Sequence, residues 1–211
     1  MSGIELNNRR QRKKEATKNK IIAVAVELFN KQGFEQTTNQ QIAERADVAI
    51  GTLYNYFETK ELIVSAYIQE VGKDSVPLVD VIMKEEKDTS ARLLALLLKM
   101  SQWNDVNREL VEIYVRSRMQ SPHKPGHKPG EHSGFGFNLI KILRLGQQQG
   151  ELRDDLAVEY LAKHLAMMYY TTLISWLADL NNDTLQNNLE KSIDLFLNGS
   201  QRKLNESGGG I

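Results

Sequence analysis

The polar side chains between residues 50 and 60 are of the types that read duplex DNA. Asn55 can pair with adenine through its amide, and Thr52 can contact a base edge or the methyl group of thymine. Phenol and ammonium groups in the same stretch suit phosphates, which position a protein on DNA without specifying the sequence. The candidate contacts of this segment are Ile50, Gly51, Thr52, Tyr54, Asn55, Tyr56 and Lys60.

The residues just before this segment predict the start of a short helix at Thr38. The Thr38 side chain can accept a backbone N–H, and Gln41 stands three residues later, which is the spacing of a capping box. Unpaired N–H groups at a helix start bind anions, so a phosphate can lie there. The candidate contacts are Thr38, Asn39 and Gln40, and Gln40 has the reach to touch a base.

These elements together predict a helix-turn-helix arrangement. The first helix ends near Ala46, a tight turn follows at Asp47, and the second helix runs over about 49–56. Leu53 and Phe57 are its inward anchors, so the opposite face stays free. In such units the second helix lies in the major groove while the first crosses the DNA backbone.

The rest of the chain also follows a helical pattern. Apolar residues spaced by three and four dominate, no convincing period-two stretch occurs, and the expected fold class is therefore all-α. A first helix is expected from about Glu15 to Lys31, with Gly33 as a left-handed cap. A helix over 59–72 follows the helix-turn-helix without a loop and predicts a rigid link.

Longer helices are expected beyond residue 72. Their predicted ranges are 75–86, 90–104, 107–120, 135–149, 155–180 and 183–198. Gly150 and Gly199 are the expected stops, and Asp154 and Asp183 are the expected N-caps.

Composition excludes several classes of protein. Of the 211 residues, 41% are hydrophobic and 26% charged, as in an ordinary soluble protein, and none is cysteine. Disulfides, thiolate zinc sites and a cysteine nucleophile are therefore excluded, and a cytoplasmic location fits. No run of about 18 uncharged apolar residues occurs, so no membrane span is expected. The polar, basic N-terminus lacks the apolar segment of a secretory signal.

The zero net charge hides a basic N-terminal arm. Residues 1–20 hold seven basic and two acidic side chains. Charge alone favours a phosphate footprint and a solvated terminus about equally. An arm of this kind can enter a minor groove beside the site read by the recognition helix. The candidate arm contacts are Arg9, Arg10, Arg12, Lys13 and Lys14.

Several spaced positions over about residues 15–65 resemble the DNA-binding domain of the TetR family. They are Gly33-Phe34, Thr37-Thr38, Ile42-Ala43, Val48, Gly51-Thr52-Leu53-Tyr54, Tyr56-Phe57 and Lys60-Glu61-Leu62. Asp47 departs from the glycine usual in the turn, but aspartate tolerates a left-handed backbone. The apolar Ile50, near the start of the recognition helix, leaves the base contacts open.

The resemblance implies a homodimer that pairs through its last two helices as a four-helix bundle. Those helices would be about 155–180 and 183–198. The apolar side chains that suit such a seam are Leu185, Leu189, Ile193 and Phe196. The same pattern suits the core of a single chain, and the two interpretations are compatible.

The resemblance also implies an effector cavity in the body. Aromatic and methionine side chains suit an apolar or aromatic effector in an adaptable pocket. The candidates are Trp103, Tyr114, His164, Met167, Met168, Tyr170 and Trp176, although ordinary core is the commoner role for each of them taken singly. Three histidines lie in the loop 121–134, where Pro and Gly preorganise metal ligands poorly, so we expect a connector, no metal and no cofactor.

The expected organisation is a basic arm and helix-turn-helix domain at 1–58, an effector-binding and dimerisation domain at 59–200, and a disordered tail at 201–211. The favoured function is a repressor that a small effector releases from a pseudo-palindromic operator by shifting populations. An activator or a ligand-requiring regulator remains open, because the sequence does not fix the sign of the response.

Two functions from other classes are disfavoured. A helical enzyme would need a phosphate loop, a paired catalytic His/Glu motif or a G-x-S-x-G turn, and we find none, so no enzymatic activity is expected. A helical interaction module would need neither the exposed Thr52–Tyr56 face nor the basic arm.

Overall fold

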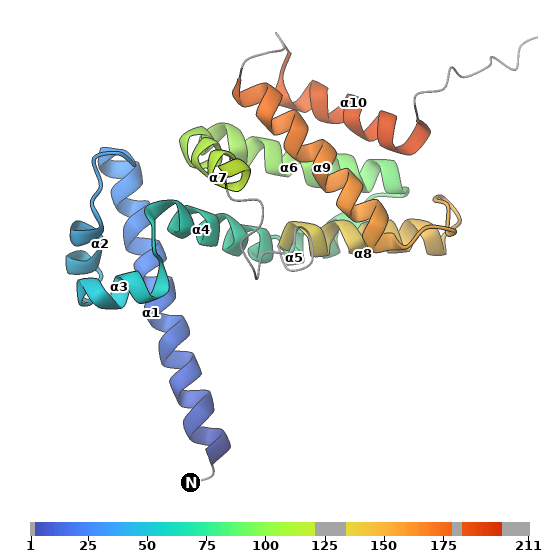
Figure 1. Cartoon of the computed structure of the whole chain (residues 1–211). Coiled ribbons are helices and arrows are strands. Elements are labelled where there is room, and N and C mark those ends of the chain that lie inside the picture. Colours follow the sequence, from blue (N-terminus) through green and yellow to red (C-terminus); the bar gives the residue numbers. More distant parts are fainter. Residues whose placement is uncertain (1–2, 121–133, 179–182, 200–211) are drawn as a thin grey trace, which may run out of the picture. The chain divides into compact units, whose positions relative to one another are not determined.

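The computed structural model describes residues 3–120, 134–178 and 183–199, and helices are the regular structure in these ranges (Figure 1). Within them no strand occurs, in agreement with the all-α prediction. None of the helices described is long and apolar enough to span a membrane. The histidine-rich segment 121–133 and the predicted tail 201–211 lie outside the described residues.

The chain divides into two compact units. The N-terminal unit comprises Met1–Gly72 and Glu109–Pro122, and the C-terminal unit comprises Lys73–Arg108 and His123–Ile211. The segment 59–72 and most of the later helix α7 (Arg108–Gln120) therefore belong with the helix-turn-helix.

The N-terminal unit begins with three helices, α1 (Gly3–Gln32), α2 (Asn39–Arg45) and α3 (Ile50–Tyr56). Helix α4 (Lys60–Asp74) follows, and Lys18 of α1 lies 3.7 Å from Glu70 of α4. Helix α2 packs against both α1 and α3. The predicted inward face of α1 is buried, at Ile21, Ala25, Leu28 and Phe29.

Helix α1 begins at Gly3, so the predicted start near Glu15 was wrong. The apolar stripe of α1 begins only at Ile21, and residues 8–16 are exposed, so hydrophobic periodicity gives no signal for the helix there. Residues 4–14 contain neither proline nor glycine and are rich in Arg and Lys, which favour helix. The basic arm is therefore the first part of a helix of roughly 45 Å, at about 1.5 Å per residue.

Two turns of the N-terminal unit confirm their predicted backbone. Gly33 has a φ of 85° and its N–H donates to the Phe29 carbonyl, which ends α1 in the left-handed conformation. Asp47 has a φ of 55°, so the aspartate does adopt the left-handed backbone in the turn between α2 and α3.

The core of the C-terminal unit is a four-helix bundle. Helix α6 (Thr89–Val106) packs against α8 (Gly134–Gln148) and α10 (Leu185–Asn198). Helix α9 (Val158–Leu177) packs against the same two, and α5 (Val76–Glu85) lies against α6 and α8. The side chains that fill the bundle are apolar and almost fully buried, among them Leu96, Leu139, Leu143, Leu165 and Leu189.

A buried arginine joins the start of α6 to the end of α8. Arg92 is only 3% exposed, and its guanidinium donates to the carbonyls of Glu86 and Lys87 and to Gln149. A side chain at Gly146 would come within 2.3 Å of the Thr89 hydroxyl. The close approach of these two helix ends therefore depends on the buried guanidinium of Arg92 and on the absence of a side chain at Gly146.

The last two helices start later than predicted. Helix α9 begins at Val158 with Ala157 as N-cap, so the prediction of Asp154 was wrong; residues 151–157 form a loop in which Arg153 pairs with Asp155. Thr184 caps α10 in place of Asp183, because its hydroxyl accepts the Asn187 N–H.

Candidate nucleic-acid interface

Helix α3 presents the polar face that its sequence predicts. Leu53 and Phe57 are buried, whereas Ile50 and Tyr54 remain 36% and 49% exposed. Asn55 is exposed, and Thr52 and Tyr56 are half-buried. Nothing lies within 4 Å of where a side chain at Gly51 would begin, so the backbone there is open to a ligand. The free face of α3 can be laid against a large surface without repacking the helix.

The start of α2 is held by the predicted capping box. The Gln41 N–H donates to the Thr38 hydroxyl at 3.2 Å, and the Thr38 N–H donates to the Gln41 side-chain oxygen at 2.9 Å. Gln40 is exposed and its amide donates to Glu44 at 2.8 Å. The cap orients Asn39 and Gln40 at the first turn, beside the free face of α3.

A side-chain hydrogen bond joins the two helices of the motif. The Asn39 amide donates to the Tyr54 hydroxyl at 3.3 Å, across the turn that separates α2 from α3. The bond places two of the predicted contact residues next to each other. The α2 start and the α3 face are therefore one surface.

Lys60 has a role that its sequence position alone does not indicate. Its ammonium group donates to the carbonyls of Phe34 and Thr37, both at 2.7 Å, and lies 4.3 Å from the centroid of the Phe34 ring. An ammonium has three donors, so two of them are used to hold the turn between α1 and α2. Lys60 therefore braces this turn.

The predicted arm residues are all exposed on the first part of α1, which extends beyond α2 and α3 in Figure 1. Arg9, Lys13 and Lys20 are spaced by four and seven residues and so share one side of the helix. On that side Lys20 lies 3.9 Å from Asp47 in the helix-turn-helix turn. A basic stripe therefore continues from the motif toward the N-terminus.

The predicted effector residues are divided between the two units of the chain. Tyr114 is buried in the N-terminal unit, whereas the other six belong to the C-terminal unit. His164 and Met167 lie on the exposed side of α9, and Trp103, Met168, Tyr170 and Trp176 are half-buried.

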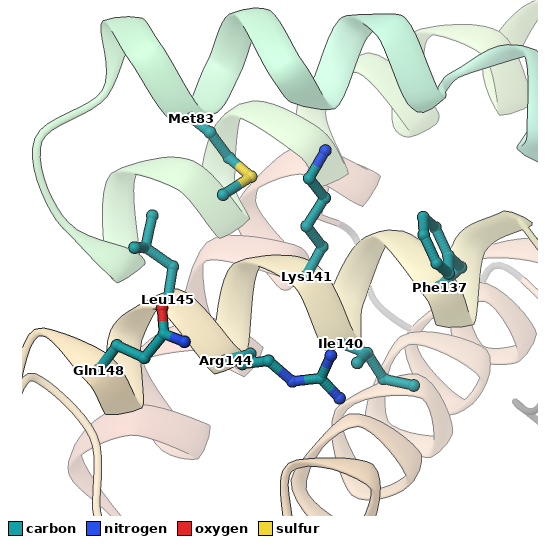
Figure 2. Close-up of a pocket in the computed structure, with 7 residues that line it drawn as sticks. All are labelled: Met83, Phe137, Ile140, Lys141, Arg144, Leu145 and Gln148. Atoms are coloured by element: carbon teal, nitrogen blue, oxygen red, sulfur yellow. The ribbon is translucent and has the colours of Figure 1, made fainter.

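A groove of about 280 Å³ opens between α5 and α8 (Figure 2). Its lining residues are Met83, Phe137, Ile140, Lys141, Arg144, Leu145 and Gln148. Lys141 is ion-paired with Asp80, and Arg144 lies 3.1 Å from Glu159. The lining therefore combines apolar side chains with two basic ones, each paired with a carboxylate.

Sequence reasoning did not identify the groove, although α8 carries a signal for it. Lys141 and Arg144 stand within an otherwise apolar face at helical spacing. Such a face is ambiguous, because long basic side chains also cover apolar surface while their charges remain in water.

Three of the four predicted dimer residues are covered within one chain. Leu185, Leu189 and Ile193 are 2%, 0% and 3% exposed on the side of α10 that packs against α6 and α9. Phe196 is half-buried. The burial of this stripe needs no second copy.

The outer side of α9 carries a second stripe that the sequence analysis did not single out. Its members alternate by four and three residues: Tyr160, His164, Met167, Thr171, Ile174 and Ala178. Tyr160 and Met167 are 52% and 54% exposed, and Ile174 is half-buried. Alternation by four and three is the seam pattern of paired helices.

Two family models match this chain. The one described as bacterial regulatory proteins, tetR family, matches residues 21–67. The one described as the C-terminal domain of TetR/AcrR family transcriptional repressors matches residues 82–199, which is more than half of the chain.

Curated relatives and solved structures agree with these matches. The transcriptional repressor KstR of Rhodococcus jostii is 26% identical over 189 residues, covering 87% of this chain and 84% of KstR. The fatty acid metabolism regulator protein of Bacillus subtilis is 24% identical over 184 residues, covering 87% of this chain and 95% of the regulator.

Among solved structures, the repressor FadR of Thermus thermophilus, in complex with lauroyl-CoA, has a TM-score of 0.80 and 25% identity. The match covers 92% of this chain and all of that one. FadR of Bacillus subtilis, in complex with stearoyl-CoA, has a TM-score of 0.65 at 24% identity, over 86% of this chain and 98% of that one, and shows the shared fold.

Proposed function

We propose that a fatty acyl thioester of coenzyme A releases this chain from its operator. The chain belongs to the TetR family of bacterial regulatory proteins and is a ligand-responsive DNA-binding repressor. It acts as a cytoplasmic homodimer on a pseudo-palindromic site and catalyses no reaction. The observation that carries the DNA-binding part is the free face of α3, joined to the start of α2 by the Asn39–Tyr54 hydrogen bond.

Within that surface each residue has a proposed role. Thr52 and Asn55 contact base edges in the major groove, and Gly51, which lacks a side chain, lets the helix approach closely beside Ile50. Tyr54, Tyr56 and Lys60 contact phosphates, as do the N–H groups at the first turn of α2. The helical arm tracks the backbone beyond the motif, because a helix with five exposed cations suits phosphates better than the narrow minor groove.

We place the dimer contact on the outer side of α9. The stripe from Tyr160 to Ala178 is exposed or half-buried in the single chain and has the seam spacing of paired helices. On α10, Leu195 is a further exposed apolar side chain, at 48%. In a symmetric dimer this stripe meets its own copy and sets the roughly 34–36 Å spacing of the two recognition helices.

The effector proposal narrows the apolar or aromatic ligand expected from the sequence. Two FadR proteins of the same fold are bound to lauroyl-CoA and stearoyl-CoA. The groove between α5 and α8 combines apolar side chains with Lys141 and Arg144, the combination that a thioester with a phosphorylated head needs. We therefore place the segment of the ligand next to its phosphorylated head in this groove.

Selection of genomic DNA by the purified dimer, followed by footprinting, tests the DNA-binding part. A protected pseudo-palindrome is expected, and affinity should fall steeply with salt because bound phosphates release counterions. Titrating that complex with lauroyl-CoA then tests the effector part, with free coenzyme A and laurate as controls. Release by the thioester alone supports the proposal. Binding that strengthens with lauroyl-CoA would reverse the sign of the response, and no effect at any concentration would reject this effector class.

A further inference from the structure

The peptide bond between Arg108 and Glu109 is one of the places where the chain passes between its two units. Helix α6 ends at Val106, Asn107 caps it, and α7 begins at Arg108. Of these neighbouring residues, Arg108 belongs to the C-terminal unit and Glu109 to the N-terminal unit. Both side chains are engaged, each within its own unit.

Arg108 holds the end of α9. Its guanidinium lies 4.2 Å from the centroid of the Trp176 ring and donates to the carbonyls of Trp176 and Leu177, at 3.2 and 3.3 Å. The last carbonyls of a helix lack partners within it and carry a partial negative charge, so a cation is favoured there. The start of α7 is thereby fixed to the end of α9.

Glu109 holds the turn that precedes α2. Its carboxylate accepts the backbone N–H of Phe34 at 3.3 Å, and Phe34 is itself buried, with its ring 5.0 Å from that of Phe29. Lys60 binds the same turn through the carbonyls of Phe34 and Thr37. Thr38, the N-cap of α2, follows directly. The carboxylate therefore helps to set where α2 begins and how its first turn faces DNA.

We infer that Arg108 and Glu109 form a two-residue coupling element that positions the DNA-binding turn according to the state of α9. A shift at the end of α9 moves Arg108, the shared backbone moves Glu109, and Glu109 changes the restraint on Phe34. This connection is separate from α4, where the chain crosses between Gly72 and Lys73. Its role in effector release rests on the proposed function, but its role in positioning the turn does not.

Hydrogen exchange on the full-length dimer tests the positioning directly, with the Phe34 amide as readout. Glu109→Ala removes the acceptor and should raise exchange at Phe34 at least about fivefold. It should also weaken operator binding about tenfold, since the bond is charge-assisted. Glu109→Gln keeps an acceptor and should restore most of both.

Glu112→Ala is the matched control. This residue is one turn further along α7, exposed and paired with Arg116 at 2.7 Å. It should leave both readouts unchanged. If Glu109→Ala behaves like Glu112→Ala, the positioning role is overturned.

Arg108 tests the connection between the units. Arg108→Ala should raise exchange at Phe34 by about twofold or more, although its own side-chain contacts lie in the other unit. Arg108→Lys keeps the charge but loses the flat guanidinium, and should fall between Ala and wild type. Unchanged exchange at Phe34 in Arg108→Ala would overturn the coupling.

Titration of the operator complex with lauroyl-CoA distinguishes a failure of this inference from a failure of the proposed function. If wild-type binding responds to the ligand, Arg108→Ala should blunt that response at least about fivefold. If wild type does not respond, the proposed effector class fails, and the exchange measurements still decide whether Arg108 and Glu109 couple the units.

Discussion

Helices α3 and α10 each have one apolar face, and their surroundings differ. On α3 only Leu53 is fully covered, and Ile50 and Tyr54 keep a third to a half of their surface exposed. On α10 the stripe of Leu185, Leu189 and Ile193 is covered by α6 and α9 of the same chain. Hydrophobic periodicity indicates that a helix face packs against a partner. It does not indicate whether that partner is the same chain, a second copy or DNA.

The largest effect is expected where α10 is covered by its own chain. Leu189→Ala should lower the free energy of unfolding by about 2–5 kcal/mol, because a fully buried leucine leaves a cavity. Leu195→Ala, on the exposed side of α10, should change it by about 0.5 kcal/mol or less. Denaturant unfolding followed by circular dichroism measures both. If the Leu189→Ala protein instead keeps its free energy of unfolding but dissociates into monomers, the stripe belongs to the dimer interface.

The next effect is expected on the open face of α3. Asn55→Ala should weaken operator binding by about 1–3 kcal/mol and relax the preference at one base pair. Alanine favours helix, so the stability of the fold should not fall. Tyr54→Phe removes a hydroxyl proposed to meet a phosphate and should weaken all sequences alike. Competition binding with single-base operator variants separates the two; identical profiles would contradict the division into base and phosphate contacts.

Helix α9, unlike α10, has a stripe of side chains that its own chain leaves exposed or half-buried. Met167→Glu should raise the dimer dissociation constant at least about tenfold, since it buries an unpaired carboxylate at the proposed seam. Met167→Leu should keep the dimer. Sedimentation across a concentration series measures both, and a Met167→Glu protein that stays fully dimeric would move the interface elsewhere.

The arm extends the α3 surface by charge alone. Replacing Arg9, Arg10 and Arg12 by Gln should reduce the slope of log affinity against log salt by about 0.9 for each phosphate that the arm no longer neutralises. The helix should persist, because glutamine also favours it. Lys99→Gln, on the exposed surface of α6, is the control and should leave the slope unchanged. An unaltered slope in the arm variant would show that the arm stays in solvent.

The smallest effect concerns the start of α10. The hydrogen bond from Lys191 to Asp183, followed by that from Asn187, lowers the pKa of Asp183 below its ordinary value of 3.8. A carboxyl with a depressed pKa contributes stability above its unfolded pKa and loses it as the pH falls through the folded value. Lys191→Met should raise the pKa of Asp183, which an NMR titration of its carboxyl carbon can follow. No change would mean that the Lys191 contact is not populated in solution.

Much of the motif could be predicted because its signals are local. Thr38 and Gln41 are three residues apart, Gly33 and Asp47 mark left-handed turns, and Leu53 is the anchor of a short helix. Each of these outcomes depends on bonds within a few residues. The start of α1 was missed because residues 8–16 are polar and exposed, and an exposed polar helix shows no apolar periodicity.

The roles of Lys60, Glu109 and the α8 groove could not be predicted, because each depends on partners far along the chain. Glu109 is 75 residues from Phe34, and Lys60 is 26 residues from it. The predicted effector residues were chosen by residue type. Residue type does not determine which unit a side chain belongs to, and Tyr114 and Trp103 lie in different units.

By itself, the sequence determined that the chain is all-α, where its helix-turn-helix lies and which face of α3 is free, because capping, turn and periodic signals act over a few residues. Only the tertiary structure decided that α10 is covered by α6 and α9, that α9 keeps an outer stripe open, and that Glu109 holds the turn before α2. Those outcomes depend on which of many possible apolar and polar surfaces meet, and packing of the whole chain selects among them.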